Sequence, residues 1–200
     1  MTARRSHASA APWRWSEDHP GWLEGIRHAR SPNFDRRPEG MAVDTLIIHY
    51  ISLPPGVFAG DAAERLFLNQ LDTDSDPRLT DLAGLRVSAH FLIRRRGEII
   101  QFVASDDRAW HAGPSRLGER ERCNDFSIGI ELEGDSLRPF TAAQYRRLDA
   151  LVNALRTRHP LAWVAGHSDI APGRKEDPGP MFDWKRVVSG RGFTGLIRPF

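Results

Sequence analysis

The hydrophobic positions of this chain form short runs and alternating stretches that predict strands, together with one long helical stripe. Val43 to Ile51 contains the continuous apolar run Leu46–Ile47–Ile48, which is typical of a central strand buried on both faces. Ser88 to Val103 predicts a hairpin of two strands around the turn Arg95–Arg96–Gly97. His49 closes the first strand, just before a loop rich in proline, and is therefore well placed for a functional site.

Two further strands carry polar residues at informative positions. Phe126 to Leu132 predicts a strand in which isoleucine and leucine alternate with glycine and glutamate, so Glu131 points away from the apolar face. Leu161 to Ala165 predicts a last short strand that delivers His167 at its end.

Thr141 to Arg158 predicts the clearest helix. Thr141–Ala142–Ala143–Gln144 has the form of a capping box, and an apolar stripe follows it, made of Leu148, Leu151, Val152 and Leu155. Asp61 to Leu71 and Asp183 to Val188 predict two more helices. Strands that alternate with helices favour a single α/β domain with a mixed central sheet flanked by helices.

The 200 residues, 40% of them hydrophobic, suit one domain with a real core. Residues 1–21 show no clear period and predict a flexible arm before a domain at 22–200. The N-terminus lacks the apolar run of a signal peptide, and no segment approaches the roughly 20 apolar residues of a membrane span. We therefore expect a cytoplasmic protein with no membrane partner.

Charge and cysteine usage narrow the functional classes further. The formal net charge is +2, and the basic residues are scattered, which disfavours a nucleic-acid partner. Cys123 is the single cysteine, so an intrachain disulfide is impossible. Lys175 and Lys185 are the only lysines, which makes a lysine within a polar loop conspicuous.

That polar loop belongs to the stretch from Gly166 to Trp184, where prolines and glycines disfavour regular structure from Ala171 to Pro180. We interpret His167 and Asp177 in this stretch as metal ligands, with His49 as the third. Two neutral imidazoles and a carboxylate, with one position left for water, are typical of a catalytic zinc site.

Each of these residues also has an ordinary structural interpretation. His49 could be a hydrogen-bonded core histidine, His167 and Asp177 could cap a turn and a helix, Glu131 could pair with an arginine, and Lys175 could be a solvated charge. His90 and His111 are candidates for contacts around the ligands or with substrate. The triplet His167–Ser168–Asp169 would alternatively fit a non-haem iron oxygenase, although no histidine follows it.

Five segments in the same order resemble one known family. They are Leu46–His49, Arg86–His90, Arg108–Gly113, Arg122–Gly134 and Gly166–Trp184. They resemble the AmpD-type 1,6-anhydro-N-acetylmuramoyl-L-alanine amidases, and the likeness runs from about Trp22 to Val187. The resemblance implies the fold of peptidoglycan-recognition proteins and an enzyme of cell-wall recycling. It implies hydrolysis of the bond between the lactyl group of anhydro-muramic acid and L-alanine.

The resemblance also implies roles for individual residues. His49, His167 and Asp177 would bind Zn²⁺. Glu131 would activate water, and Lys175 would stabilise the oxyanion. Arg86, Trp110 and Arg122 match positions that face the ligand, and an arginine can bind a carboxylate of the stem peptide in bidentate fashion.

The resemblance implies an anhydro-muropeptide as the partner, and we expect a monomer, although the sequence itself leaves the oligomeric state open. Two departures bear on substrate preference. Tyr50 stands where the family often has asparagine, and Arg78–Leu79 stands where it often has an aromatic pair. A sensor that binds muropeptides without cutting them remains an alternative.

Overall fold

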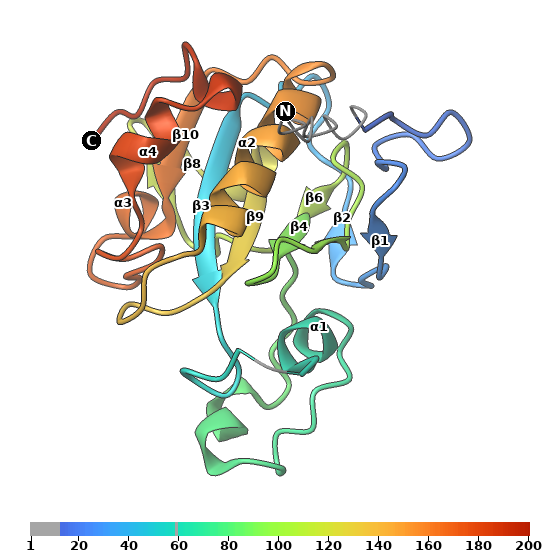
Figure 1. Ribbon diagram of the computed structural model, residues 1–200. Coiled ribbons are helices and arrows are strands. Elements are labelled where there is room, and N and C mark those ends of the chain that lie inside the picture. The colour runs from blue at the N-terminus through green and yellow to red at the C-terminus, as the bar shows by residue number, and fades with distance from the viewer. Residues whose placement is uncertain (1–12, 59) are drawn as a thin grey trace, which may run out of the picture.

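A mixed sheet forms the centre of the molecule, and helices flank it (Figure 1). The structure is a computed structural model that describes residues 13–58 and 60–200. Over these residues the main sheet has six strands, in the spatial order β1 (Arg27–His28), β5 (Ile99–Gln101), β4 (Phe91–Ile93), β9 (Ser127–Glu133), β3 (Thr45–Ile51) and β10 (Trp163–Gly166). This arrangement confirms the predicted α/β class.

The middle of the sheet is parallel. β3 pairs in parallel with β9 on one side and with β10 on the other. Leu46, Ile47 and Ile48 have no exposed surface, which confirms the prediction of a central strand covered on both faces. Because parallel strands end at the same edge of a sheet, the residues that follow β3 and β10 come together.

The predicted hairpin is confirmed, because β4 and β5 pair in an antiparallel manner. Gly97 closes the turn with a positive φ of 87°, a conformation that favours glycine. β1 adds an outer strand parallel to β5. Two small sheets lie outside the main one: β2 (Phe34–Asp35) pairs with β6 (Arg108–Ala109), and β7 (Arg116–Leu117) pairs with β8 (Arg120–Glu121).

Helix α2 (Ala142–Arg156) covers one face of the sheet and crosses in front of β3 and β9 in Figure 1. Its capping box is formed: Thr141 Oγ1 accepts from the Gln144 N–H at 3.1 Å, and Gln144 Oε1 accepts from the Thr141 N–H at 3.0 Å. The predicted apolar stripe packs into the main core with alternate residues of β9. Glu131 therefore lies on the opposite face.

The remaining helices are short. They are α1 (Ala62–Phe67), α3 (His167–Ile170) and α4 (Trp184–Val188), with 3-10 helices η1 (Pro77–Leu82), η2 (Cys123–Asp125) and η3 (Arg191–Phe193). α1 is shorter than the predicted helix because the chain turns at Asn69, where φ is 58°. In Figure 1, α1 and η1 extend beyond the carboxyl ends of β3 and β9.

The predicted N-terminal arm falls partly outside the described residues, which begin at Trp13. Trp13 and Trp15 pack against the main core, and Trp15 Nε1 donates to Thr157 Oγ1 at 3.0 Å. The boundary at residue 21 stays a prediction. None of the helices in the described part of the chain is long and apolar enough to cross a bilayer.

A buried histidine on the α2 side predicts acid sensitivity. His159 Nε2 lies 2.8 Å from Ser105 Oγ, and burial lowers the pKa of His159 from 6.5 to about 4. Between these pH values the unfolded chain binds more protons here than the folded chain, so the free energy of unfolding decreases as the pH falls. The expected loss is on the order of 3 kcal/mol by pH 4.

Urea unfolding of metal-free protein at pH 7, 5.5 and 4 checks this expectation. The variant His159→Gln retains a polar side chain that does not titrate, so it should lose less stability on acidification. Equal losses in the variant and the parent would show that His159 does not contribute.

Candidate active site

Two strand ends and one loop bring the predicted ligands together. His49 lies near the carboxyl end of β3, and His167 follows directly after β10, whose last residue, Gly166, pairs with Ile48. Asp177 comes from the loop after α3, and its carbonyl oxygen accepts a hydrogen bond from the Ser168 N–H at 2.8 Å. The loop is therefore fastened to the start of the helix that carries His167.

The ligand atoms lie close enough to share one ion. His49 Nδ1 lies 3.0 Å from His167 Nδ1, and Asp177 Oδ2 lies 2.9 Å from the first nitrogen and 3.1 Å from the second. All three side chains are buried. Ligands about 2.0–2.1 Å from a tetrahedral zinc ion stand about 3.3 Å apart, so this set fits the metal.

The other ring nitrogens favour the same interpretation. His167 Nε2 lies 3.0 Å from the carbonyl oxygen of Ala112, which only accepts, so Nε2 carries the proton and Nδ1 of the neutral ring keeps a lone pair. Burial, the largest cause, lowers the pKa of His49 to about 4. His49 is therefore neutral at pH 7, as a metal ligand must be.

His49 is oriented by a chain of hydrogen bonds. Its Nε2 lies 2.9 Å from His111 Nδ1, and His111 Nε2 lies 3.3 Å from Ser127 Oγ, which donates to the carbonyl oxygen of Cys123 at 2.5 Å. Because Ser127 Oγ donates its own proton to the carbonyl oxygen, it accepts from His111 Nε2, and His111 Nδ1 in turn accepts from His49 Nε2. The proton of the His49 ring is therefore on Nε2, and Nδ1 keeps a lone pair. The sequence left two roles open for His111, support of a ligand or contact with substrate. The hydrogen bond to His49 favours support of a ligand.

Gly129 makes room for His111. A Cβ atom added at Gly129 would lie 2.4 Å from His111 Cγ, far inside contact distance. We expect Gly129→Ala to displace His111, lower the free energy of unfolding by about 1–3 kcal/mol and weaken metal binding about tenfold or more. Urea unfolding and a competitive zinc titration measure the two effects. An unchanged zinc affinity would contradict the supporting role of His111.

Glu131 lies beside the ligands. It is the cross-strand partner of His49 and is 8% exposed. Its Oε2 atom has no hydrogen-bond partner among the described residues. Burial, followed by the nearby charge of Asp177, raises the pKa of Glu131 well above its ordinary value. A buried carboxylate oxygen without a partner is suited to bind a water molecule and exchange a proton with it.

Lys175 is exposed on the loop between α3 and Asp177. Its backbone N–H donates to the carbonyl oxygen of Ala171 at 3.1 Å. Its charge opposes the rise in the pKa of Glu131, so the ammonium group lies within electrostatic reach of that carboxyl group. The role of Lys175 in stabilising an oxyanion stays a prediction.

The residues expected to face substrate lie around this centre rather than in it. Arg86 is exposed and lines a hollow of about 220 Å³ beside η1. Trp110 is half-buried, and its backbone N–H donates to Ser88 Oγ at 3.0 Å. Arg122 is exposed before η2. The structure brings none of the three into contact with the metal ligands, and their substrate roles stay predictions.

Sequence reasoning missed Arg37 and Asn124. Asn124 Oδ1 accepts from the backbone N–H groups of His111 and Ala112 at 3.2 and 2.8 Å, and Arg37 donates to backbone carbonyl oxygens that include those of Asn124 and Ser127. Burial lowers the pKa of Arg37 to about 10, so it is charged at pH 7. Its irregular, polar surroundings in the sequence offered no signal.

A second hollow, of about 540 Å³, is lined by Tyr50, Ser136 and Glu176 among others. The Tyr50 hydroxyl donates to Glu176 Oε1 at 2.5 Å. Tyr50 follows the ligand His49, and Glu176 precedes the ligand Asp177. Tyr50, which stands where the family often has asparagine, thus forms part of the wall of a hollow next in sequence to two candidate ligands.

Comparisons with known proteins agree with this geometry. The model of the N-acetylmuramoyl-L-alanine amidase family matches residues 39–180. A relative from Citrobacter freundii, the 1,6-anhydro-N-acetylmuramyl-L-alanine amidase AmpD, is 51% identical over 181 residues, which are 90% of this chain and 94% of the relative.

Solved structures point the same way. A crystal structure of a selenomethionine derivative of AmpD has a TM-score of 0.82 at 51% identity and covers 86% of this chain and 97% of that chain. The amidase AmiD from E. coli, solved with anhydro-N-acetylmuramic acid-L-Ala-D-γ-Glu-L-Lys, has a TM-score of 0.55 at 31% identity and covers 78% of this chain and 60% of its own.

Drosophila PGRP-LB, at 19% identity, has a TM-score of 0.57 and covers 86% of this chain and 97% of its own, which confirms the predicted recognition-protein fold. The family match extends over most of the chain, and the relative is about half identical. Together they show that this chain belongs to the N-acetylmuramoyl-L-alanine amidase family, as its motifs predict.

Proposed function

We propose that this protein hydrolyses the amide bond between the lactyl group of 1,6-anhydro-N-acetylmuramic acid and L-alanine of the stem peptide, with Zn²⁺ held by His49, His167 and Asp177. The observation that carries the proposal is the convergence of three ligand atoms within 3.1 Å of one another beside Glu131, whose buried Oε2 has no hydrogen-bond partner among the described residues. The substrates in the names of AmpD and of the AmiD complex support the anhydro sugar.

The proposed chemistry uses the metal and two side chains, Glu131 and Lys175. A bound zinc ion would polarise the scissile carbonyl group and lower the pKa of water in the site. Glu131 accepts a proton as the water oxygen bonds to the carbonyl carbon, and it returns that proton to the alanine nitrogen as the C–N bond breaks. Lys175 stabilises the negative charge that develops on the carbonyl oxygen.

We assign the peptide and the sugar of the substrate to different groups of residues around the candidate metal site. Arg86, Trp110 and Arg122 would bind the peptide, because guanidinium groups pair well with its carboxylates. The hollow beside Tyr50 would accommodate the sugar, with Tyr50 and Glu176 as its wall. A role in cell-wall recycling, a cytoplasmic location and a monomeric state belong to the same proposal.

Hydrolysis in ¹⁸O-labelled water tests the bond that is cut. Zinc-loaded protein and anhydro-N-acetylmuramoyl-tripeptide should yield free tripeptide and an anhydro-muramic acid that carries one ¹⁸O atom in its lactyl carboxylate, detected by mass spectrometry. Intact muropeptide with measurable binding would instead identify a sensor. A label in any other product would overturn the proposed bond specificity.

A further inference from the structure

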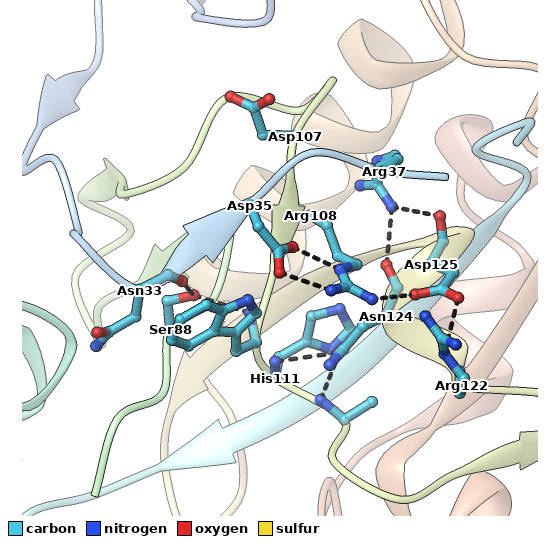
Figure 2. Close-up of polar contacts among 12 residues, drawn as sticks. Asn33, Asp35, Arg37, Ser88, Asp107, Arg108, His111, Arg122, Asn124 and Asp125 are labelled. Atoms are coloured by element: carbon cyan, nitrogen blue, oxygen red, sulfur yellow. Dashed lines mark hydrogen bonds and ion pairs between the residues drawn. The ribbon is translucent and has the colours of Figure 1, made fainter. Parts of the chain in front are cut away.

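Four charged side chains form a continuous row that ends on Arg122 (Figure 2). Arg108 Nε and Nη2 donate to the two carboxylate oxygens of Asp35, each at 2.6 Å. Arg108 Nη1 donates to Asp125 Oδ1 at 2.5 Å, and Arg122 Nε lies 3.1 Å from Asp125 Oδ2. Positive and negative groups thus alternate from Asp35 to Arg122.

The backbone holds both ends of this row in place. Asp35 in β2 is the direct cross-strand partner of Arg108 in β6. Arg122 precedes η2 with a positive φ of 60°, which is uncommon for a residue other than glycine, and its carbonyl oxygen accepts from the Asp125 N–H at 2.8 Å. The arrangement therefore fixes where the Arg122 side chain leaves the backbone.

Asp125 divides its two oxygens between two arginines. Without Arg108, both oxygens of Asp125 would be free to bind Arg122 in a bidentate manner. With Arg108 on Oδ1, Arg122 approaches Asp125 Oδ2 through Nε, and its two Nη atoms make no hydrogen bond to the described residues, so the edge that they form stays available. A guanidinium edge of this kind matches the spacing of a carboxylate.

Arg122 is the most exposed side chain of the row. The Asp125 side chain is 9% exposed, whereas that of Arg122 is 69% exposed. Arg122 lines a hollow of about 470 Å³ together with Ser115, Arg116, Glu121 and Ile170. The hollow is thus lined by two cationic side chains and one anionic side chain, and it borders α3, the helix that starts with His167.

The same turn also reaches the metal ligands. Asn124, next to Asp125, binds the backbone N–H of Ala112, and the Ala112 carbonyl oxygen accepts from His167 Nε2 at 3.0 Å. Figure 2 shows His111 and Asn124 close to the row formed by Asp35, Arg108, Asp125 and Arg122. One turn therefore fixes a cationic group relative to the reaction centre.

We propose that Asp125 and Arg108, braced by Asp35, are positioning residues that present Arg122 to a carboxylate of the stem peptide. The inference rests on the proposed function, because it takes the stem peptide as the ligand of Arg122. Asp125 and Arg108 act through Arg122 and do not touch the substrate themselves.

Binding measurements separate positioning from general structural support. The zinc-loaded variant Glu131→Gln serves as a non-hydrolysing parent. Calorimetry then gives its Kd for anhydro-N-acetylmuramoyl-L-Ala-D-γ-Glu-L-Lys and for the analogue whose peptide carboxylates are carboxamides. The Kd of the carboxamide analogue divided by the Kd of the carboxylate ligand measures carboxylate recognition. We expect Arg122→Ala to reduce this ratio about tenfold.

In the same parent, Asp125→Asn should remove most of the recognition that Arg122→Ala removes, while the Kd of the carboxamide analogue stays within about twofold. The double variant should lose no more than Arg122→Ala alone. Asp35→Asn, at the far end of the row, should give a smaller reduction because Asp35 contacts Arg108 rather than Arg122, and it decides the matter if Asp125→Asn does not fold.

Arg120→Gln is the matched control. It removes a positive charge two residues from Arg122, but the Arg120 guanidinium is already paired with Asp44. Its Kd ratio should equal that of the parent. A thermal unfolding scan of each variant confirms that it is folded at the temperature of the titration.

Three results would overturn the inference: an unchanged ratio in Arg122→Ala, an unchanged ratio in Asp125→Asn and Asp35→Asn, or equal weakening of both ligands by Asp125→Asn. Cleavage by the protein with Glu131 intact is measured separately. A lack of cleavage would refute the proposed hydrolysis, while the Kd ratios would still decide the role of Asp125.

Discussion

Replacing Glu131 with glutamine should reduce kcat about a thousandfold and leave zinc bound. Glutamine has nearly the same shape as glutamate, so the three ligand side chains keep their positions, but the amide cannot accept the proton of the attacking water. Because Glu131 Oε2 has no partner among the described residues, the change breaks no protein hydrogen bond at that atom. Steady-state kinetics with anhydro-muropeptide and metal analysis of the same sample measure both effects.

Glu133→Gln is the matched control for this experiment. Glu133 lies two residues further along β9, so its side chain leaves the same face of the strand, and its Oε2 accepts from the Arg95 N–H at 2.9 Å. The control should keep kcat within about twofold of the parent. A Glu131→Gln enzyme with near-normal kcat would remove Glu131 from the mechanism.

Asp177→Ala should abolish both zinc binding and turnover, with a fall in kcat/KM of about four orders of magnitude or more. The substitution removes the only carboxylate of the ligand set and leaves two neutral imidazoles. Zinc at a thousandfold excess over its Kd should stabilise the parent by about 4 kcal/mol. The same addition should leave the melting temperature of the variant unchanged. Metal analysis, kinetics and thermal unfolding with and without zinc check these outcomes.

Glu176→Gln controls for the loss of a negative charge from the same loop. Glu176 is adjacent to Asp177 but binds the Tyr50 hydroxyl rather than the ligand cluster. This control should bind one zinc ion per chain. If Asp177→Ala retained full zinc affinity, or Glu176→Gln lost it, the assignment of the carboxylate ligand would be wrong.

Much of the fold was predictable because its signals are local. The apolar run at Leu46–Ile48, the alternation around Glu131 and the capping box at Thr141 each depend on a few neighbouring residues, and each is present in the structure. The order of the strands depends on pairings between distant segments, so periodicity does not reveal it. α1 is shorter than predicted because a single backbone conformation at Asn69 ends it.

Part of the candidate site was likewise predictable from the sequence, and part was not. Residue types and motif order indicated His49, His167, Asp177 and Glu131, and the structure places these four together. The choice of Nδ1 as the ligand atom depends on Ala112 and His111, which come from a distant loop.

The polar network beneath that loop could not be predicted either. Arg37 and Asp125 lie in segments without a hydrophobic period, and their partners are defined only by the folded chain.

Metal removal and reconstitution test the central claim most directly. Protein freed of metal by a chelator is titrated with Zn²⁺ while the release of peptide from anhydro-muropeptide is followed. The account predicts no release from metal-free protein and full activity at one zinc ion per chain, with neither zinc binding nor activity in Asp177→Ala. Peptide release that persists without metal, or that returns equally in Asp177→Ala, would contradict a single ion shared by His49, His167 and Asp177.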